Sequence, residues 1–431
     1  MSVGTDRLRD EPDLLRRAAT DKGEDAGLID AALALDERRR LLLAEGDALK
    51  SERNAASSRI GQVVRDGADP DGPEVAELKR TSLRAGERIS AIDRELESVQ
   101  ADLDDAMLRV PNPADPDVPV GGEEANRVVR TWGEPLSRSA DGFDRRPHWE
   151  LAEALGMIDN ARGAKVTGSG WPVYIGAGAA LQRALITWFL DVHATEHGMT
   201  EVWPPALVNA DSARGTGQIP DKEDQMYVVS RDDLYLVPTA EVPVTNLHRD
   251  EILEADVLPL RYAAYSPCFR REAGAAGRDT RGILRVHQFD KVEMVSFVLP
   301  AESEGELEWL TERAEALLQR LGLAYRVVLM ATREMGFVHA KKYDLEVWAP
   351  GVERWLEVSS VSNFRDYQAR RMAIRHRPEP GAKPELVHTL NGSALALART
   401  VAALLETHQQ PDGSITVPEP LRARMGLNRI I

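Results

Sequence analysis

The sequence predicts an α+β protein in which an antiparallel α-helical coiled-coil hairpin precedes a larger domain of strands and helices. Two observations predict this organisation. Apolar residues recur at seven-residue intervals before residue 110, which is typical of coiled coils. Beyond about residue 165, strand-like and helix-like segments alternate. The length of 431 residues suffices for two or three domains.

Two heptad series build the predicted hairpin. The first series consists of Leu28, Leu35, Leu42, Leu49, Ala56 and Val63. After a break at 67–73, the second series has Val75, Ser82, Ile89, Leu96 and Leu103 at one seam position and Leu78, Ala85, Ile92, Val99 and Ala106 at the other. Two such helices joined by one turn form a hairpin over about residues 28–109, projecting about 55 Å. Pro111 and Pro113 end it, so we expect an N-terminal domain at 1–113 and a second domain at 114–431.

Composition favours an intracellular enzyme. Cys268 is the only cysteine, which excludes an intrachain disulfide and a cysteine-based zinc site, so no zinc is expected. The chain has no apolar run of about 18 residues, and its first ten residues are too polar for a signal peptide. We therefore expect no membrane contact and a cytoplasmic location.

The charge balance restricts the nucleic-acid partners that the chain could bind. A net charge of −16 argues against non-specific binding, so any contact with a nucleic acid must be local. Basic residues in the outer half of the hairpin are nearly balanced by acidic ones, which favours contact with a nucleic-acid backbone only weakly. A structural or dimerising coiled coil is the alternative interpretation of the hairpin.

The strongest chemical signal lies in 268–294, where strand-like ends flank a middle broken by glycines. This stretch carries Arg270, Arg271, Arg278, Arg281 and Arg285. Two adjoining strands place several guanidinium groups on one side of a sheet, and their planar donors suit phosphate oxygens. Because such a cluster repels itself without an anion, it predicts a polyphosphate ligand; a solvated basic hairpin is the alternative. No G-x-x-x-x-G-K-[ST] motif occurs, so ATP would bind in a sheet-based arginine cradle.

Three further clusters add candidate chemistry. Leu236–Glu241 offers a hydroxyl and a carboxylate where a strand meets a helix. Trp355–Asn363 presents Glu357 and then small hydroxyls along a strand, and His388–Arg399 turns into an Ala- and Leu-rich helix. Each cluster alone is also compatible with an ordinary buried carboxylate, strand end or helix cap.

Together these motifs resemble class II aminoacyl-tRNA synthetases, and specifically the bacterial-type seryl-tRNA synthetases. Residues 269–293 are similar to the second signature motif of that class, and 392–399 to the third. Pro204-Pro205 is similar to the first, which lies at the dimer interface in the class. The seryl branch is indicated by 239–241, 215–220 and 388–393. The resemblance implies a homodimer whose catalytic domain is built on an antiparallel β-sheet flanked by helices.

The resemblance also implies an ATP site. Arg270 is expected to grip the α-phosphate, Glu272 to contact the adenine edge and Phe289 to stack on the adenine ring. The full expected set is Arg270, Arg271, Glu272, Val286, Phe289, Glu357, Val358, Ser359, Ser360 and Arg399. Arg270, Arg285 and Arg399 are the expected catalytic residues. Glu357 and Ser360 are expected to hold Mg²⁺ together with ATP.

A serine site is implied beside it. The expected residues are Thr239, Ala240, Glu241, Arg270, Glu293, Asn391 and Ser393. The physical chemistry agrees, since an ammonium group needs a carboxylate and a small hydroxyl needs paired donors and acceptors. Alanine would be rejected because it leaves those polar groups unpaired. The implied reaction forms seryl-adenylate from L-serine and ATP and passes serine to tRNA(Ser), which the hairpin clasps; use of tRNA(Sec) is left open.

The chain departs from the family pattern around this site. It has Ala331-Thr332-Arg333-Glu334 where Cys-Thr-Gly-Asp is usual, Val361 in place of a cysteine, and Trp171-Pro172 in place of Arg-Phe. Because the motif residues remain, we hypothesise an active enzyme with altered surroundings of the pocket, namely a second copy that tolerates serine-mimicking inhibitors. Two alternatives are a ligase that charges a carrier protein and a non-catalytic RNA-binding relative.

Overall fold

The computed structural model describes residues 3–273 and 281–431, so the predicted loop arginine Arg278 lies outside the described residues. The chain divides into two compact units. The first comprises residues 1–20 and 24–110, and the second comprises residues 21–23 and 111–431. No helix among the described residues is long and apolar enough to cross a lipid bilayer.

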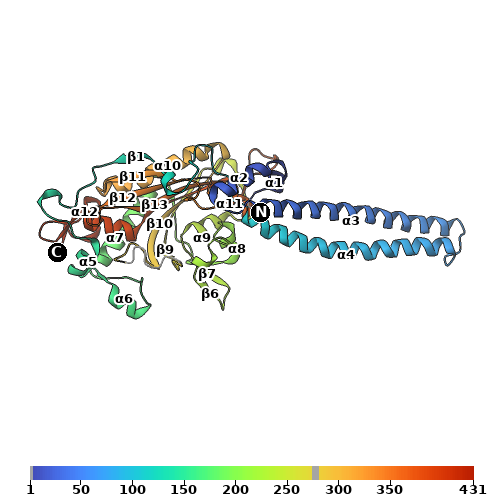
Figure 1. Cartoon of the computed structure of the whole chain (residues 1–431), viewed down its shortest axis with the longest axis horizontal. Coiled ribbons are helices and arrows are strands. Elements are labelled where there is room, and N and C mark those ends of the chain that lie inside the picture. Colours follow the sequence, from blue (N-terminus) through green and yellow to red (C-terminus); the bar gives the residue numbers. More distant parts are fainter. Residues whose placement is uncertain (1–2, 274–280) are drawn as a thin grey trace. The chain divides into compact units, whose positions relative to one another are not determined.

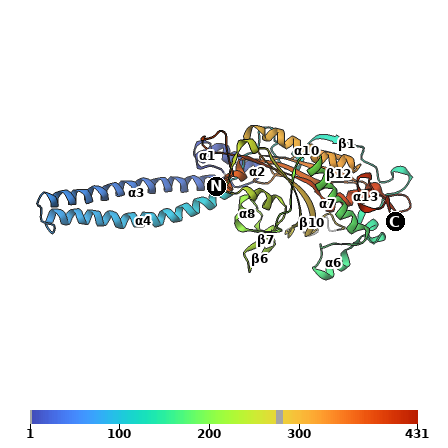
Figure 2. The same cartoon turned by 180° about the vertical axis from the view of Figure 1, so that it is seen from behind.

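The first unit contains a long two-helix hairpin. Its short leading helices are α1 (Thr5–Asp10) and α2 (Pro12–Lys22, whose last two residues belong to the second unit). Helices α3 (Gly27–Arg65) and α4 (Pro73–Arg109) then run side by side in opposite directions (Figures 1 and 2). The seam buries Leu42, Ala56 and Val63 of α3 and Val75, Ala85, Ile89, Ile92 and Leu103 of α4. The predicted antiparallel hairpin is thereby confirmed.

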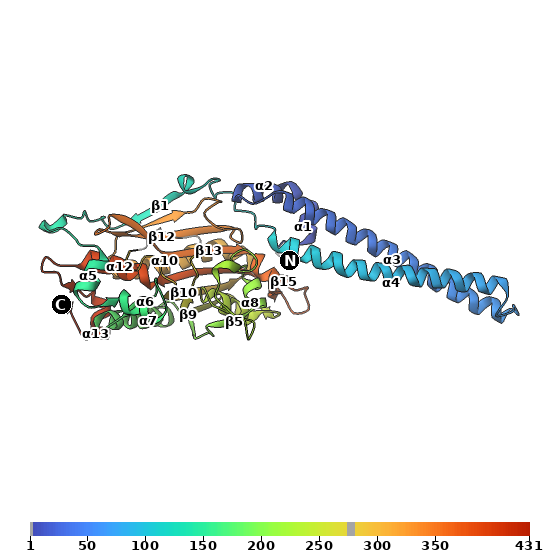
Figure 3. The same ribbon diagram turned by 60° about the horizontal axis from the view of Figure 1, so that its bottom comes forward.

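The second unit is organised around an eight-stranded sheet. In spatial order its strands are β1 (Arg127–Trp132), β11 (Tyr325–Leu329), β12 (Lys341–Ala349), β13 (Arg354–Arg365), β16 (His388–Ala396), β10 (Gln288–Val298), β9 (Leu260–Phe269) and β4 (Thr200–Val202). Neighbours in this order pair antiparallel except β4 and β9, which pair parallel. Helices α7 (Ala177–Thr195), α10 (Ser303–Arg320) and α12 (Leu397–His408) pack against the sheet (Figure 3). The predicted antiparallel sheet flanked by helices is confirmed.

Shorter elements surround this sheet. The helices are α5 (His148–Ala154), α6 (Asn160–Val166), α8 (Ala210–Gly215), α9 (Glu241–Thr245), α11 (Tyr367–Arg371) and α13 (Glu419–Met425). The strands are β2 (Ile158–Asp159), β3 (Val173–Tyr174), β5 (Leu207–Asn209), β6 (Val228–Val229), β7 (Leu234–Leu236), β8 (Ile252–Glu254), β14 (Arg375–Arg377), β15 (Glu385–Leu386), β17 (Ile415–Thr416) and β18 (Arg429–Ile430).

Strand β10 shows why the sheet has one apolar and one functional face. Successive side chains of a strand point to opposite faces. Val292 and Met294 are fully buried in the main core, whereas Phe289, Lys291 and Glu293 line a cavity on the other face. Val292 and Met294 thus stabilise the sheet from one face. On the other face Phe289, Lys291 and Glu293 reach the cavity, and Val295 and Phe297 belong to a separate apolar cluster.

Strand β13 carries a β-bulge that changes this alternation. Leu345 of β12 pairs with Ser359, but the next residue, Glu346, pairs with Glu357, which leaves Val358 as an extra residue. Glu357 and Ser360 are three positions apart, so a regular strand would direct them to opposite faces. With the bulge, both side chains line the same cavity.

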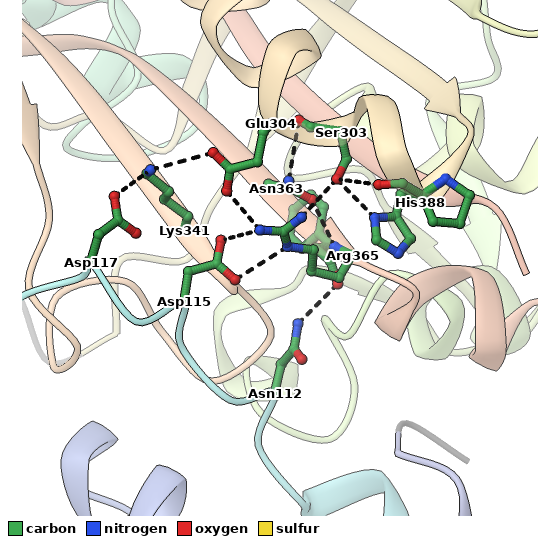
Figure 4. Close-up of polar contacts among 11 residues, drawn as sticks. Asn112, Asp115, Asp117, Ser303, Glu304, Lys341, Asn363, Arg365 and His388 are labelled. Atoms are coloured by element: carbon green, nitrogen blue, oxygen red, sulfur yellow. Dashed lines mark hydrogen bonds and ion pairs between the residues drawn. The ribbon is translucent and has the colours of Figure 1, made fainter.

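A polar network fixes the segment that follows α4 to the sheet of the second unit (Figure 4). Arg365 of β13 donates hydrogen bonds to Asp115 and Glu304, each with a shortest distance of 2.7 Å. Asn112 Nδ2 donates to the carbonyl oxygens of Val338 (3.0 Å) and Phe364 (2.9 Å). Since Val338 and Phe364 line the cavity, this network supports one of its walls.

Candidate active site

The functional face of the sheet opens into a cavity of about 580 Å³. Strands β10, β13 and β16, the start of α12 and the segments around β9 and β10 contribute its lining. Of the predicted residues, the cavity is lined by Thr239, Glu241, Arg270, Glu272, Arg285, Val286, Phe289, Glu293, Glu357, Val358, Ser359, Ser360, Asn391, Ser393 and Arg399. Ala240 is fully buried at the start of α9, and Arg271 is exposed and donates to the carbonyl oxygen of Asp224 (3.0 Å); neither lines the cavity.

One cluster of lining residues, which we call the arginine end, consists of Arg270, Arg285 and Arg399. The Arg270 guanidinium lies over the Phe289 ring, 5.1 Å from its centroid. A cation above an aromatic face is attracted by the electrons of the ring. The backbone N–H of Arg270 donates to the carbonyl oxygen of His287 (2.9 Å), which fixes the residue at the end of β9.

The other two arginines of this end make contacts with their own surroundings. Arg285 donates to Glu272 Oε2 (2.7 Å). Arg399, in the first turn of α12, donates from Nε to the carbonyl oxygen of Leu284 (3.1 Å) and from Nη1 to that of Glu357 (3.1 Å). The hydrogen bonds bring residues that are far apart in sequence to one wall of the cavity.

Acidic groups near β13 balance part of this positive charge. Burial opposes ionisation of Glu357, but Lys342, Arg399 and Arg270 outweigh it and hold the pKa of Glu357 below its ordinary value. Asp344 of β12 accepts a bond from Lys342 Nζ (3.1 Å), and its pKa is raised by burial. Asp344 does not line the cavity, and among the described residues no donor reaches its buried Oδ1.

A second cluster of lining residues, which we call the carboxylate end, consists of Glu241, Glu293, Asn391 and Ser393. Asn391 Nδ2 donates to both carboxylates, at 2.7 Å to Glu241 Oε2 and at 3.1 Å to Glu293 Oε1. Lys291 pairs with Glu293 and donates to Ser393 Oγ (3.1 Å). All of these polar groups are almost completely buried.

Two features make the carboxylate end ready for a small polar ligand. Burial and the charge of Glu293 raise the pKa of Glu241 to about 7. Within the described part of the chain, Asn391 Oδ1 is buried and has no donor. A buried acceptor without a partner is costly, so a ligand that donates a hydrogen bond there would be favoured.

Comparison with known proteins places the chain in a family. Residues 5–114 match the seryl-tRNA synthetase N-terminal domain, and residues 227–408 match the tRNA synthetase class II core domain (G, H, P, S and T). The chain is 55% identical to a serine–tRNA ligase of Thermomicrobium roseum, over 97% of this chain and 92% of that protein. The chain belongs to the seryl-tRNA synthetase family. Its reaction is the ATP-dependent ligation of serine to tRNA.

Further relatives agree with this assignment. A serine–tRNA ligase of Geobacillus kaustophilus is 51% identical over 98% of both chains. The crystal structure of the Pyrococcus horikoshii seryl-tRNA synthetase, complexed with ATP, matches with a TM-score of 0.93 and 38% identity, covering 100% of this chain and 99% of that one. The similarity to this synthetase family therefore extends over both units.

Several lining or supporting residues were missed by the sequence analysis. Lys291 could have been found, because it stands two positions before Glu293 and so shares its strand face. Lys342 and Asp344 show the same alternation on β12. Gln368, which donates to Glu241 Oε1 (2.7 Å), comes from α11 and gave no local signal.

The positions that depart from the family pattern lie in different surroundings. Arg333 and Glu334 line the cavity. Val361 is fully buried in the core and does not line it. Trp171 stacks on His287, with ring centroids 5.7 Å apart and an interplanar angle of 30°. Only the first two departures can therefore contact a ligand in the cavity directly.

Proposed function

We propose that the cavity binds ATP at its arginine end and L-serine at its carboxylate end, so that the two substrates meet near Arg270. The observation that carries this proposal is the division of charge within one cavity. Guanidinium groups suit phosphates, and the buried Glu241 and Glu293 suit an ammonium group. Asn391 Oδ1 offers an acceptor for a donor of the amino acid.

The residues then have distinct roles in seryl-adenylate formation. A serine carboxylate oxygen attacks the α-phosphorus of ATP, the bond from that phosphorus to the bridging oxygen breaks, and pyrophosphate leaves. Arg270 holds the α-phosphate, while Arg285 and Arg399 stabilise the charge on the departing phosphates. Catalysis rests on positioning and electrostatics, without a covalent enzyme intermediate.

ATP contacts are assigned to Arg270, Glu272, Val286, Phe289, Glu357, Val358, Ser359, Ser360 and Arg399. Serine contacts are assigned to Thr239, Glu241, Arg270, Glu293, Asn391 and Ser393. Arg271 and Ala240 remain supporting residues of the same two sites, because their backbones adjoin lining residues.

The residues around β13 fit a magnesium ion bound together with ATP. Mg²⁺ prefers carboxylate and other oxygen ligands, and Glu357 and Ser360 would hold it. The ion would neutralise charge on the phosphate oxygens when bound.

Residues 1–113 are proposed as the tRNA-binding domain and 114–431 as the catalytic domain. Exposed basic residues of α3 and α4, such as Arg53 and Arg84, would contact the backbone of tRNA(Ser). We also propose that the hairpin binds tRNA(Sec), provided that this tRNA presents the same shape to the hairpin as tRNA(Ser). The cytoplasmic location remains a prediction.

A homodimer is proposed through the surface near β4 and α7. Trp203 is 74% exposed there. Together with Tyr174, Ile186 and Leu190 it lines a surface hollow. An exposed aromatic residue above an apolar hollow is typical of protein interfaces. Trp203→Glu should produce a monomer in light scattering, and an unchanged mass would contradict this interface.

Serine-dependent pyrophosphate exchange, followed by charging of total tRNA, tests the proposal. Exchange and charging are both expected. Exchange without charging would favour a ligase for a carrier protein, and no exchange would favour a non-catalytic relative. Alanine in place of serine provides the specificity control.

Tolerance of serine-mimicking inhibitors is proposed because Arg333 and Glu334 line the cavity. A non-hydrolysable seryl-adenylate analogue should inhibit Arg333→Gly/Glu334→Asp more strongly than the native enzyme. Equal inhibition constants would refute the idea.

A further inference from the structure

Glu406 and His148 form a buried pair outside the cavity. Both side chains are completely inaccessible to solvent. His148 is the first residue of α5. Glu406 lies on α12, seven residues and therefore about two turns after Arg399. Since neither residue lines the cavity, any role in catalysis must act through the residues that they hold.

The Glu406 carboxylate is saturated with hydrogen bonds. Its Oε1 accepts from the backbone N–H of His148 (2.9 Å) and contacts His148 Nδ1 (2.8 Å). Its Oε2 accepts from the N–H groups of Gly351 (2.8 Å) and Val352 (3.1 Å). These two residues form the turn between β12 and β13. The carboxylate therefore fixes the entrance to the strand that carries Glu357.

The His148 ring continues the chain of hydrogen bonds to the segment that follows the arginine-rich loop. The Ile283 N–H donates to His148 Nε2 over a long 3.4 Å. Because an amide N–H can only donate, Nε2 accepts, and the ring proton resides on Nδ1, from which it is donated to Glu406. The approach is close at the preceding residue, Gly282, where a Cβ would lie 2.2 Å from Nε2.

Helix α12 thus holds segment 283–285 at two points about two turns apart. At one point Arg399 Nε donates to the carbonyl oxygen of Leu284 (3.1 Å). At the other, Glu406 reaches the Ile283 N–H through His148. The two held groups, the Ile283 N–H and the Leu284 carbonyl oxygen, belong to consecutive residues, so this short backbone stretch is fixed directly before Arg285. The side chain that follows directly is Arg285.

We propose that the His148–Glu406 pair is a positioning device for the triphosphate of ATP. It fixes the position of Arg285 relative to Arg399. It also fixes the start of β13 relative to both arginines. This inference rests on the proposed ATP site. Phosphoryl chemistry depends strongly on the placement of charge-stabilising groups, so a small displacement of Arg285 should weaken ATP use.

His148→Asn tests the proposal in the full-length enzyme. The asparagine amide can still donate to Glu406, but its shorter side chain cannot reach the Ile283 N–H. We expect the KM for ATP in pyrophosphate exchange to rise about three- to tenfold, the range of one lost hydrogen bond. The KM for serine should stay within about twofold, because the carboxylate end is not held by this pair. Glu406→Gln should show the same selective change.

His408→Asn is the matched control. His408 is on the same helix and contacts the carbonyl oxygen of Leu321 (2.8 Å), away from the cavity. Its replacement should lower the melting temperature without changing either KM. A purely structural role for the His148–Glu406 pair would give the same result in His148→Asn and in Glu406→Gln, and would overturn the proposal. Equal increases in both KM values would also overturn it. Absence of exchange in the native enzyme would instead refute the proposed function itself.

Discussion

Arg285 donates a hydrogen bond to Glu272 across 2.7 Å, although thirteen positions separate the two residues. Both are assigned to ATP, and in the structure they satisfy each other. The pair keeps an otherwise repulsive arginine end neutralised, which lowers the cost of holding three guanidinium groups together. In the proposed complex with ATP, contacts with the nucleotide would replace this one.

Replacing either partner should weaken ATP use. We expect Arg285→Ala and Glu272→Ala each to lower kcat/KM for ATP about ten- to a hundredfold, as for lost charged hydrogen bonds. Arg285→Lys should retain part of the activity, since it keeps the charge without the planar fork. The kcat/KM for ATP of each variant is measured by pyrophosphate exchange, with the ATP concentration varied at saturating serine. A wild-type value for Arg285→Ala would contradict the assignment.

Asn391 should determine the affinity for serine. Asn391→Ala leaves Glu241 Oε2 and Glu293 Oε1 without their shared donor and removes the free Oδ1 acceptor. We expect the KM for serine to rise about ten- to a hundredfold, with the KM for ATP unchanged. Exchange kinetics with serine varied provide the test. Equal effects on both substrates would indicate a general distortion of the cavity.

The raised pKa of Glu241 predicts a pH dependence. An ammonium group needs the ionised carboxylate, so kcat/KM for serine should increase with pH and level off above about 7. Glu241→Gln should abolish this increase at the cost of lower activity. A native profile that is flat between pH 5.5 and 8.5 (about the range accessible to the assay) would exclude this role.

The same pKa predicts the sign of a stability effect. Because the folded protein retains a proton that the unfolded chain releases, the contribution of Glu241 to stability is complete below its ordinary value of 4.5 and is lost as pH rises through about 7. The native protein should therefore lose stability as the pH rises through about 7. The free energy of unfolding of Glu241→Gln should not show this decrease. Denaturant titrations at several pH values measure the difference.

The helical hairpin should affect charging but not activation. Arg53 and Arg84 are exposed on α3 and α4, so Arg53→Ala/Arg84→Ala should raise the KM for tRNA and reduce its salt slope by about 2. Pyrophosphate exchange should be unaffected. The exposed Glu52, next to Arg53, provides the control, since Glu52→Ala should not weaken charging. Loss of exchange in the double variant would contradict a separate role for the hairpin.

Local patterns in the sequence were sufficient for the main elements. The heptads of α3 and α4 predicted the hairpin, because apolar residues repeated every seven positions lie along one side of a helix and pack against a partner helix. The strand-like ends of 268–294 correspond to the end of β9 and to β10. Most of the site residues that the family motifs identified line the cavity, including Arg270 and Arg399.

Features that depend on contacts between distant segments could not be predicted in this way. The bulge at Val358, which brings Glu357 and Ser360 to one face, arises from the pairing of β12 with β13. Gln368 reaches Glu241 from another helix.

The sequence by itself determined the main secondary-structure elements, the family and the chemical types of the site residues. Each of these depends on the spacing and the kinds of residues along the chain. Only the tertiary structure decided which donors meet which acceptors. Arg285 facing Glu272, and Glu406 reaching Ile283 through His148, are results of packing. A hydrogen bond depends on positions within a few tenths of an ångström, and no one-dimensional pattern specifies positions at that scale.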